Sequence, residues 1–226
     1  DEVMGWIMDT YSMFKGYSVP GVVTGKPLEI GGTLGRQEAT GRGVVYIIND
    51  LAPLVGFSFK NAKVAIQGFG KVGSVLAQLL AHQGCKIIAI CDISGGVYRE
   101  SGLDIDELIH YVKNNPDQTI KGYKTSGISE FPKEEIFSFD VDLFIPAAKE
   151  NQITAPIAKK LNTKIIAEAA NGPTLVDADE ILESRNIIVI PDILVSAGGL
   201  VVSYFEWVQN IQSLMWDENE VNELLM

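Results

Sequence analysis

The stretch Ala65–Gly73, AIQGFGKVG, decides the fold of this chain. The apolar run Val64–Ile66 predicts a buried strand, and an apolar pattern at helical spacing follows the stretch. The turn between them has the pattern G-x-G-x-x-G. Gly68 permits the tight turn, Gly70 lets a pyrophosphate approach the backbone, and Gly73 lets the helix pack close to the strand. The N-terminus of that helix offers free N–H groups and a positive dipole end to phosphates.

A second apolar strand, Lys86–Cys91, supports this interpretation because it ends at an acid. Asp92 comes nineteen residues after Gly73, and its carboxylate can accept hydrogen bonds from an adenosine ribose. The glycine pattern alone is weak evidence, and the alternative is a glycine turn in an ordinary α/β domain. Between a strand and a helix, with an acid ending the next strand, the pattern predicts a dinucleotide site.

Composition limits the other classes of function. The 226 residues suffice for one α/β domain with additional segments, and the 46% of hydrophobic residues allows a sizeable core. The formal net charge of −11 argues against a nucleic-acid partner, and no apolar run is long enough to span a membrane. Cys85 and Cys91 bracket one predicted strand, so they cannot form a disulfide and indicate buried thiols in a reducing cytoplasm. His82 and His110 have no partner at metal-ligand spacing, so no metal site is expected.

Strands and helices alternate along the chain. This order predicts a doubly wound, Rossmann-like α/β fold with a parallel sheet and helices on both faces. We expect helices over Met4–Phe14, Val44–Val55 and Leu200–Met215, the last with an apolar stripe at Val201, Tyr204, Phe205, Val208, Ile211 and Met215. We expect residues 114–133 to be irregular and residues 191–199 to form a loop.

The glycine-rich segment Gly35–Gly43, GRQEATGRG, precedes one of these helices. Glycines so near a helix start are costly unless something packs against them. One interpretation is a close helix–helix crossing at Gly41 and Gly43. The other is a ligand that lies on the first helical turns, with Arg36 and Thr40 pointing at it.

Small or polar residues follow several predicted strands. They are the glycine turn, Asp92, Pro146–Ala148, the pair Asn171 and Gly172, and Ser196–Gly199. Ligands of such sheets bind beyond the carboxyl ends of the strands, where small side chains leave room for a flat ligand. Each of these segments taken singly could simply form a turn, but together they predict one edge of a cleft.

Six segments, distributed over essentially the whole chain, resemble those of glutamate dehydrogenase of the small hexameric type. They are VMGWIMDTY (3–11), PGVVTGKP (20–27), GRQEATGRG (35–43), GFGKVG (68–73), AEAANGP (167–173) and SAGGLVVSYFEWVQN (196–210). The related leucine, phenylalanine and valine dehydrogenases are the alternative within the superfamily. A non-catalytic nucleotide-sensing domain is the alternative from another class.

The resemblance implies oxidative deamination of L-glutamate to 2-oxoglutarate and ammonium with NAD or NADP. It places the pyrophosphate at Gly68, Phe69, Gly70, Lys71, Val72 and Gly73, and the adenosine ribose at Asp92 and Ile93. It places the nicotinamide at Arg36 and Thr40, and its ribose at Ala147, Ala148 and Asn171. It places the substrate at Leu200 and Ser203, which we expect on one face of the first turn of their helix. Asp92 favours NAD, since a carboxylate repels a 2′-phosphate.

The resemblance also implies that the catalytic lysine and aspartate belong to an N-terminal substrate domain outside this chain. We therefore expect no catalytic residue here, and a chain that binds dinucleotide without turnover. Residues 1–34 would be an entry helix and loop from the hinge, residues 35–215 the dinucleotide-binding domain, and residues 216–226 the start of a C-terminal helical segment. The full-length protein is expected to be a homohexamer, and this chain a monomer or a weak non-native oligomer.

Overall fold

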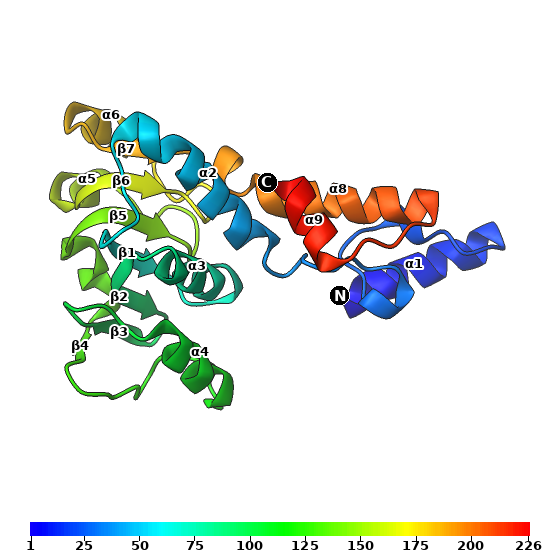
Figure 1. Cartoon of the computed structure of the whole chain (residues 1–226), viewed down its shortest axis with the longest axis horizontal. Coiled ribbons are helices and arrows are strands. Elements are labelled where there is room, and N and C mark those ends of the chain that lie inside the picture. The colour runs from blue at the N-terminus through cyan, green and yellow to red at the C-terminus, as the bar shows by residue number, and fades with distance from the viewer.

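A computed structural model describes all 226 residues and contains one seven-stranded sheet. The strand order is β4-β3-β2-β1-β5-β6-β7, with β1 at the centre of the sheet (Figure 1). The strands are β1 (Lys63–Gln67), β2 (Lys86–Asp92), β3 (Gly95–Tyr98), β4 (Ser129–Phe131), β5 (Asp140–Pro146), β6 (Asn162–Ala167) and β7 (Ile188–Ile190). The predicted doubly wound α/β fold is confirmed, because five of these strands pair in parallel and helices cover both faces.

The sheet departs from the prediction at one edge, where β3 and β4 are antiparallel. Only Ile93 and Ser94 separate β2 from β3, which is too short for the crossover that a parallel pair needs. Strand β4 lies within residues 114–133, where we expected irregular structure. Its pattern is hard to recognise because only Phe131 of its three residues is buried.

Nine α-helices and three short 3-10 helices connect the strands. The α-helices are α1 (Glu2–Lys15), α2 (Ala39–Val55), α3 (Lys71–His82), α4 (Ile105–Asn114), α5 (Ala155–Lys160), α6 (Val176–Ser184), α7 (Asp192–Val195), α8 (Ala197–Gln212) and α9 (Glu218–Leu225). The 3-10 helices are η1 (Pro20–Val22), η2 (Leu28–Ile30) and η3 (Lys133–Ser138). No helix has both the length and the apolar character needed to cross a membrane.

The core consists of two apolar layers, one on each face of the sheet. Helices α2, α3 and α4 pack on one face through side chains such as Val44, Leu76 and Leu108. Helices α5 and α6 pack on the other face, where Ala158 and Leu182 are fully buried. This burial of apolar surface is the main term that stabilises the sheet.

Helices α1, α8 and α9 lie to one side of the sheet (Figure 1). The predicted helix near the N-terminus is confirmed, but α1 buries none of its residues and leaves Trp6 65% and Phe14 89% exposed. The predicted loop at residues 191–199 instead contains α7 and the first turn of α8. Helix α8 therefore begins and ends three residues before the predicted range.

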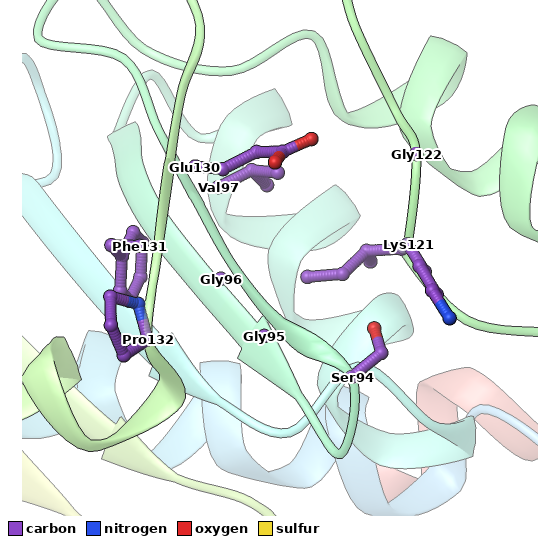
Figure 2. Close-up of a pocket in the computed structure, with 10 residues that line it drawn as sticks. Ser94, Gly95, Gly96, Val97, Lys121, Gly122, Glu130, Phe131 and Pro132 are labelled. Carbon is purple, nitrogen blue, oxygen red and sulfur yellow. The ribbon is translucent and has the colours of Figure 1, made fainter.

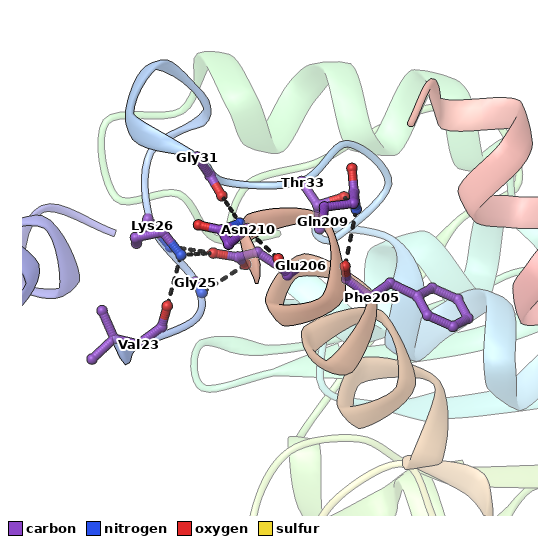
Figure 3. A network of polar contacts seen from close by, with 9 residues as sticks. All are labelled: Val23, Gly25, Lys26, Gly31, Thr33, Phe205, Glu206, Gln209 and Asn210. Atoms are coloured by element: carbon purple, nitrogen blue, oxygen red, sulfur yellow. Dashed lines mark hydrogen bonds and ion pairs between the residues drawn. The ribbon is translucent and has the colours of Figure 1, made fainter. Parts of the chain in front are cut away.

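The predicted apolar stripe on α8 is wrong about which face is buried. Tyr204 and Ile211 are exposed, whereas Glu206 and Gln209 are buried. The buried face is polar because its side chains hydrogen-bond to the loop between α1 and α2, as Figure 3 shows. The solvation that a polar group loses on burial is offset only when that group finds a hydrogen-bond partner. Glu206 and Gln209 each have at least two such partners.

Glu206 and Lys26 form the centre of this polar network. The Nζ of Lys26 lies 2.5 Å from Oε1 of Glu206, and it also donates to the carbonyl oxygen of Val23 at 2.6 Å. The other carboxylate oxygen of Glu206 accepts the N–H of Gly25 at 2.8 Å. One turn further along, Gln209 donates to the hydroxyl of Thr33 at 2.8 Å. The loop between α1 and α2 is therefore fixed to α8.

Candidate dinucleotide site

The glycine turn after β1 has the geometry that its sequence predicts. Gly68 has a φ of +104°, in the left-handed region that favours glycine. A Cβ on Gly73 would lie 1.9 Å from the carbonyl oxygen of Gly68, so only glycine lets α3 pack this closely. A Cβ on Gly70 would meet no atom within 4 Å. The backbone at Gly70 is therefore open to an approaching group.

Helix α3 begins directly at this turn. Gly70 is its N-cap residue and makes no side-chain cap, so the first N–H groups of α3 remain available. Phe69 is buried, Val72 is half-buried and Lys71 is exposed. Unpaired N–H groups and the helix dipole favour an anion at this position.

A cleft of about 390 Å³ opens beyond the ends of β5 and β6, next to the glycine turn. The parallel strands bring their carboxyl ends to one edge, where the N–H of Ala147 donates to the carbonyl oxygen of Gln67 at 2.7 Å. The lining of the cleft includes five of the predicted residues, namely Thr40, Val72, Ala147, Ala148 and Asn171. The other lining residues are Lys149, Glu150, Ala169, Ala170 and Ser196. Small side chains predominate, which leaves room for a flat ligand.

Asp92 lies at the end of β2 and makes contacts that the sequence does not show. Its Oδ1 accepts the N–H and the hydroxyl of Ser94, and its Oδ2 accepts the N–H of Ile120 at 2.8 Å. The carboxylate thus fastens the loop after α4 to the end of β2. Ile93, beside it, is 84% exposed. Neither residue lines the cleft that contains Thr40 and Asn171.

A second hollow, of about 270 Å³, lies on the antiparallel side of β2. Figure 2 shows Ser94 and Lys121 at one end of it, and Phe131 with Pro132 across strand β3. The ring of Phe131 covers Gly96, which has no side chain to obstruct it. This hollow borders the position that the resemblance assigns to the adenosine ribose.

The structure shows the close helix crossing at Gly41 and Gly43, whereas a ligand at Arg36 and Thr40 stays a prediction. A Cβ on Gly41 would lie 2.7 Å from Val75 of α3, and one on Gly43 would lie 2.8 Å from the Cα of Gly198 in α8. These glycines therefore serve helix packing. Thr40 instead lines the cleft, and Arg36 is a half-buried residue close to Thr40 and to the start of α8.

Arg36 carries a buried Nε that has no hydrogen-bond partner. A Cβ on Gly199 would lie 3.6 Å from its Nη1 and 2.5 Å from the hydroxyl oxygen of Thr40, so these groups crowd the N-terminal turn of α8. Guanidinium groups bind carboxylates in a bidentate manner. An unpaired guanidinium beside a helix N-terminus can therefore hold an anion.

We expected Leu200 and Ser203 to share the first turn of their helix. They do not, because α8 begins earlier, at Ala197. Leu200 lies in the first turn and is 75% exposed, and Ser203 lies in the second. The hydroxyl of Ser203 donates to the carbonyl oxygen of Gly199 at 2.9 Å. Its lone pairs remain free to accept a hydrogen bond.

Sequence reasoning missed two polar residues at the ends of strands that lead to the cleft. Gln67, at the end of β1, donates to Oε1 of Gln152 at 3.0 Å. Glu168, at the end of β6, accepts the N–H of Asp192 at 3.0 Å. Burial raises the pKa of the Glu168 carboxyl, while the hydrogen bond from the N–H of Asp192 acts in the opposite direction. The only signal for Gln67 and Glu168 in the sequence is the presence of a polar residue at the end of an apolar strand.

The sequence profile of the glutamate/leucine/phenylalanine/valine dehydrogenases matches residues 31–226. The chain belongs to this family of amino-acid dehydrogenases. It is 49% identical to glutamate dehydrogenase A2 of Halobacterium salinarum over 219 residues, which are 97% of this chain and 52% of that protein. It is 45% identical to a catabolic NAD-specific glutamate dehydrogenase of Bacillus subtilis and 46% identical to an NADP-specific one of Synechocystis, each over 99% of this chain.

Solved structures agree with the sequence comparison. A hetero-hexameric glutamate dehydrogenase from Thermus thermophilus, crystallised with leucine, superposes with a TM-score of 0.88 at 34% identity. The match covers 99% of this chain and 52% of that one. The predicted resemblance to glutamate dehydrogenase is confirmed, and the chain spans about half the length of the relatives it matches.

Proposed function

We propose that this chain is the dinucleotide-binding part of an enzyme that deaminates L-glutamate oxidatively to 2-oxoglutarate and ammonium. The observation that carries the proposal is the open backbone at Gly70, at the start of α3 and beside a cleft of small side chains. Relatives specific for NAD and for NADP match the chain almost equally well. NAD is the proposed cofactor and NADP the alternative.

Each end of the cofactor has a proposed place. The pyrophosphate lies on the turn Gly68–Gly73, and the adenosine ribose lies near Asp92 and Ile93. The nicotinamide lies near Arg36 and Thr40, and its ribose lies in the cleft against Ala147, Ala148 and Asn171. These residues would hold the cofactor, which would supply an acceptor for the hydride from the α-carbon of the substrate.

The substrate lies at the start of α8 in this proposal. The unpaired guanidinium of Arg36 supports a carboxylate there, and the hydroxyl of Ser203 and the side chain of Leu200 belong to the same helix turns. The catalytic lysine and aspartate that the resemblance implies match no motif in residues 1–226. The chain alone therefore binds the dinucleotide but does not turn over glutamate.

The proposed domain division rests on the exposed apolar side chains of α1 and α8. Residues 1–34 lead to a substrate domain that covers these helices, residues 35–215 form the dinucleotide-binding domain, and residues 216–226 begin a helical segment. The side chains involved are Trp6, Ile7, Tyr11, Phe14, Tyr204, Trp207 and Ile211. Exposed apolar surface of this kind marks an interaction site. The full-length protein is proposed to be a cytoplasmic homohexamer.

Fluorescence quenching tests this division. Trp6 is measured alone in a variant that carries Trp207→Phe and Trp216→Phe. Acrylamide should quench Trp6 readily in the chain and weakly in the full-length protein. Equal quenching in both would contradict the covering domain. Light scattering of the full-length protein should give the mass of a hexamer.

Calorimetric titration of the chain with NAD⁺ and NADP⁺ tests the cofactor site. We expect saturable binding, tighter for NAD⁺, that is abolished by Gly70→Glu because the new carboxylate occupies the phosphate position. Gln83→Glu is the matched control, since it adds the same charge at the exposed far end of α3. Absence of binding in the unaltered chain, or equal binding by Gly70→Glu, would contradict the proposal.

A further inference from the structure

A chain of hydrogen bonds connects the three loops that follow β5, β6 and β7. Oδ2 of Asp192 accepts the N–H of Gly172 at 2.7 Å, and the carbonyl oxygen of Gly172 accepts the N–H of Asn151 at 2.9 Å. Glu168 accepts the N–H of Asp192 at 3.0 Å. Asp192, which follows β7 at the start of α7, therefore holds the loop after β6. That loop in turn holds the loop after β5.

Asp192 also fixes the approach to α8. Its carbonyl oxygen accepts both the N–H of Ser196 at 2.8 Å and the hydroxyl of Ser196 at 2.6 Å. Ser196 lines the cleft, and α8 begins at the next residue. The cleft wall made by Ser196 and the wall made by Asn171 are therefore held by the same residue.

Neither Asp192 nor Glu168 lines the cleft, so neither is placed to touch the cofactor. Asn171, which does line it, is exposed, and it is followed by Gly172 at a φ of +51°. The position of the Asn171 amide thus depends on how the Gly172 peptide is held. Burying a carboxyl such as that of Glu168 is costly, and here it accepts the N–H of Asp192 at the start of α7.

We propose that Asp192 and Glu168 are positioning residues that order Asn171 and Ser196 before the nicotinamide half of the dinucleotide binds. This inference rests on the proposed function and adds to it. A loop that is already ordered loses less conformational freedom when the ligand arrives, so affinity rises without a new contact. Removing the Asp192 carboxylate should weaken binding of that half by roughly tenfold, the effect of about one lost hydrogen bond.

The experiment compares NAD⁺ with ADP as probes in calorimetric titrations of the chain. ADP carries the adenosine and both phosphates but neither the second ribose nor the nicotinamide. In Asp192→Ala we expect the affinity for NAD⁺ to fall roughly tenfold and that for ADP to stay within about twofold. Glu168→Ala should show the same selective loss, and Glu168→Gln should restore NAD⁺ affinity because its amide oxygen still accepts the N–H of Asp192.

The outcomes separate this inference from the proposed function. Equal losses for NAD⁺ and ADP in Asp192→Ala, or no loss for either, would overturn the positioning role while the cofactor site stands. An unaltered chain that binds neither probe would overturn the cofactor site itself. Asp177→Ala, which removes an exposed acid from the first turn of α6, is the matched control and should leave both affinities unchanged.

Discussion

Lys26 and Glu206 form an ion pair from which solvent is excluded, although they lie 180 residues apart. Removing one partner leaves the other charge buried, which typically costs about 3–5 kcal/mol. We therefore expect Glu206→Ala to lower the free energy of unfolding by about this amount in urea denaturation followed by circular dichroism. The double variant Lys26→Met with Glu206→Leu should be less destabilised than Glu206→Ala. Equal losses in the two variants would contradict a cost due to the unpaired charge.

The glycine turn gives a second prediction from two neighbouring substitutions. Gly73→Ala should destabilise the chain, because the new Cβ would lie 1.9 Å from a backbone oxygen that cannot move freely. Gly70→Ala should leave the melting temperature nearly unchanged, because its Cβ meets no atom within 4 Å. NAD⁺ affinity should nevertheless fall in Gly70→Ala, because the methyl group points where the phosphate would approach. A Gly70→Ala variant with normal affinity would show that the open backbone is not used.

Asp92 gives a third prediction, on the mobility of the loop after α4. Asp92→Ala removes the acceptor for the N–H groups of Ser94 and Ile120, which should lower the free energy of unfolding by about 1–3 kcal/mol. Hydrogen exchange should become faster at Ile120. Asp117→Ala, an exposed acid in the same loop, is the control and should change neither quantity. Unchanged exchange at Ile120 in Asp92→Ala would contradict the fastening role.

Because of its two buried cysteines, we expect the chain to lose stability at alkaline pH. Burial raises the pKa of Cys85 and that of Cys91 from 9.0 to about 12. Because both thiols ionise more easily in the unfolded chain, their contribution to stability is complete below pH 9 and is lost as the pH rises toward 12. Urea denaturation between these pH values should show the decline, and a variant with Cys85→Ala and Cys91→Ala should show less of it. A thiol reagent at a pH of about 8 should label neither cysteine until the chain unfolds.

Local patterns in the sequence predicted the parts of the fold that depend on neighbours in the chain. The turn Gly68–Gly73 was predictable because three glycines at fixed spacing each meet a separate steric demand. The gathering of Thr40, Ala147 and Asn171 was predictable in outline because parallel strands end at one edge of a sheet. Whether these residues bind a cofactor stays a prediction.

Several misplaced features depend on partners far away in the sequence. Glu206 and Gln209 have the same residue types as exposed helix positions, and only the loop near Lys26 explains why they are buried. Tyr204 was included in the apolar stripe because apolar residues at helical spacing usually face the core. Glu168 and Asp192 were overlooked because each resembles an ordinary residue of a turn, and their connection appears only when β6 and β7 lie side by side.

Helix α8 is one rigid element that connects the cleft with the loop of Lys26, and this connection has a mechanical consequence. Its first residues cross α2 at Gly198 beside the cleft, and its middle holds the loop of Lys26. Its 16 residues span about 24 Å at 1.5 Å per residue. A tilt of roughly 10° about the crossing would displace the far end by about 4 Å, so α8 acts as a lever that enlarges any small shift at the cleft.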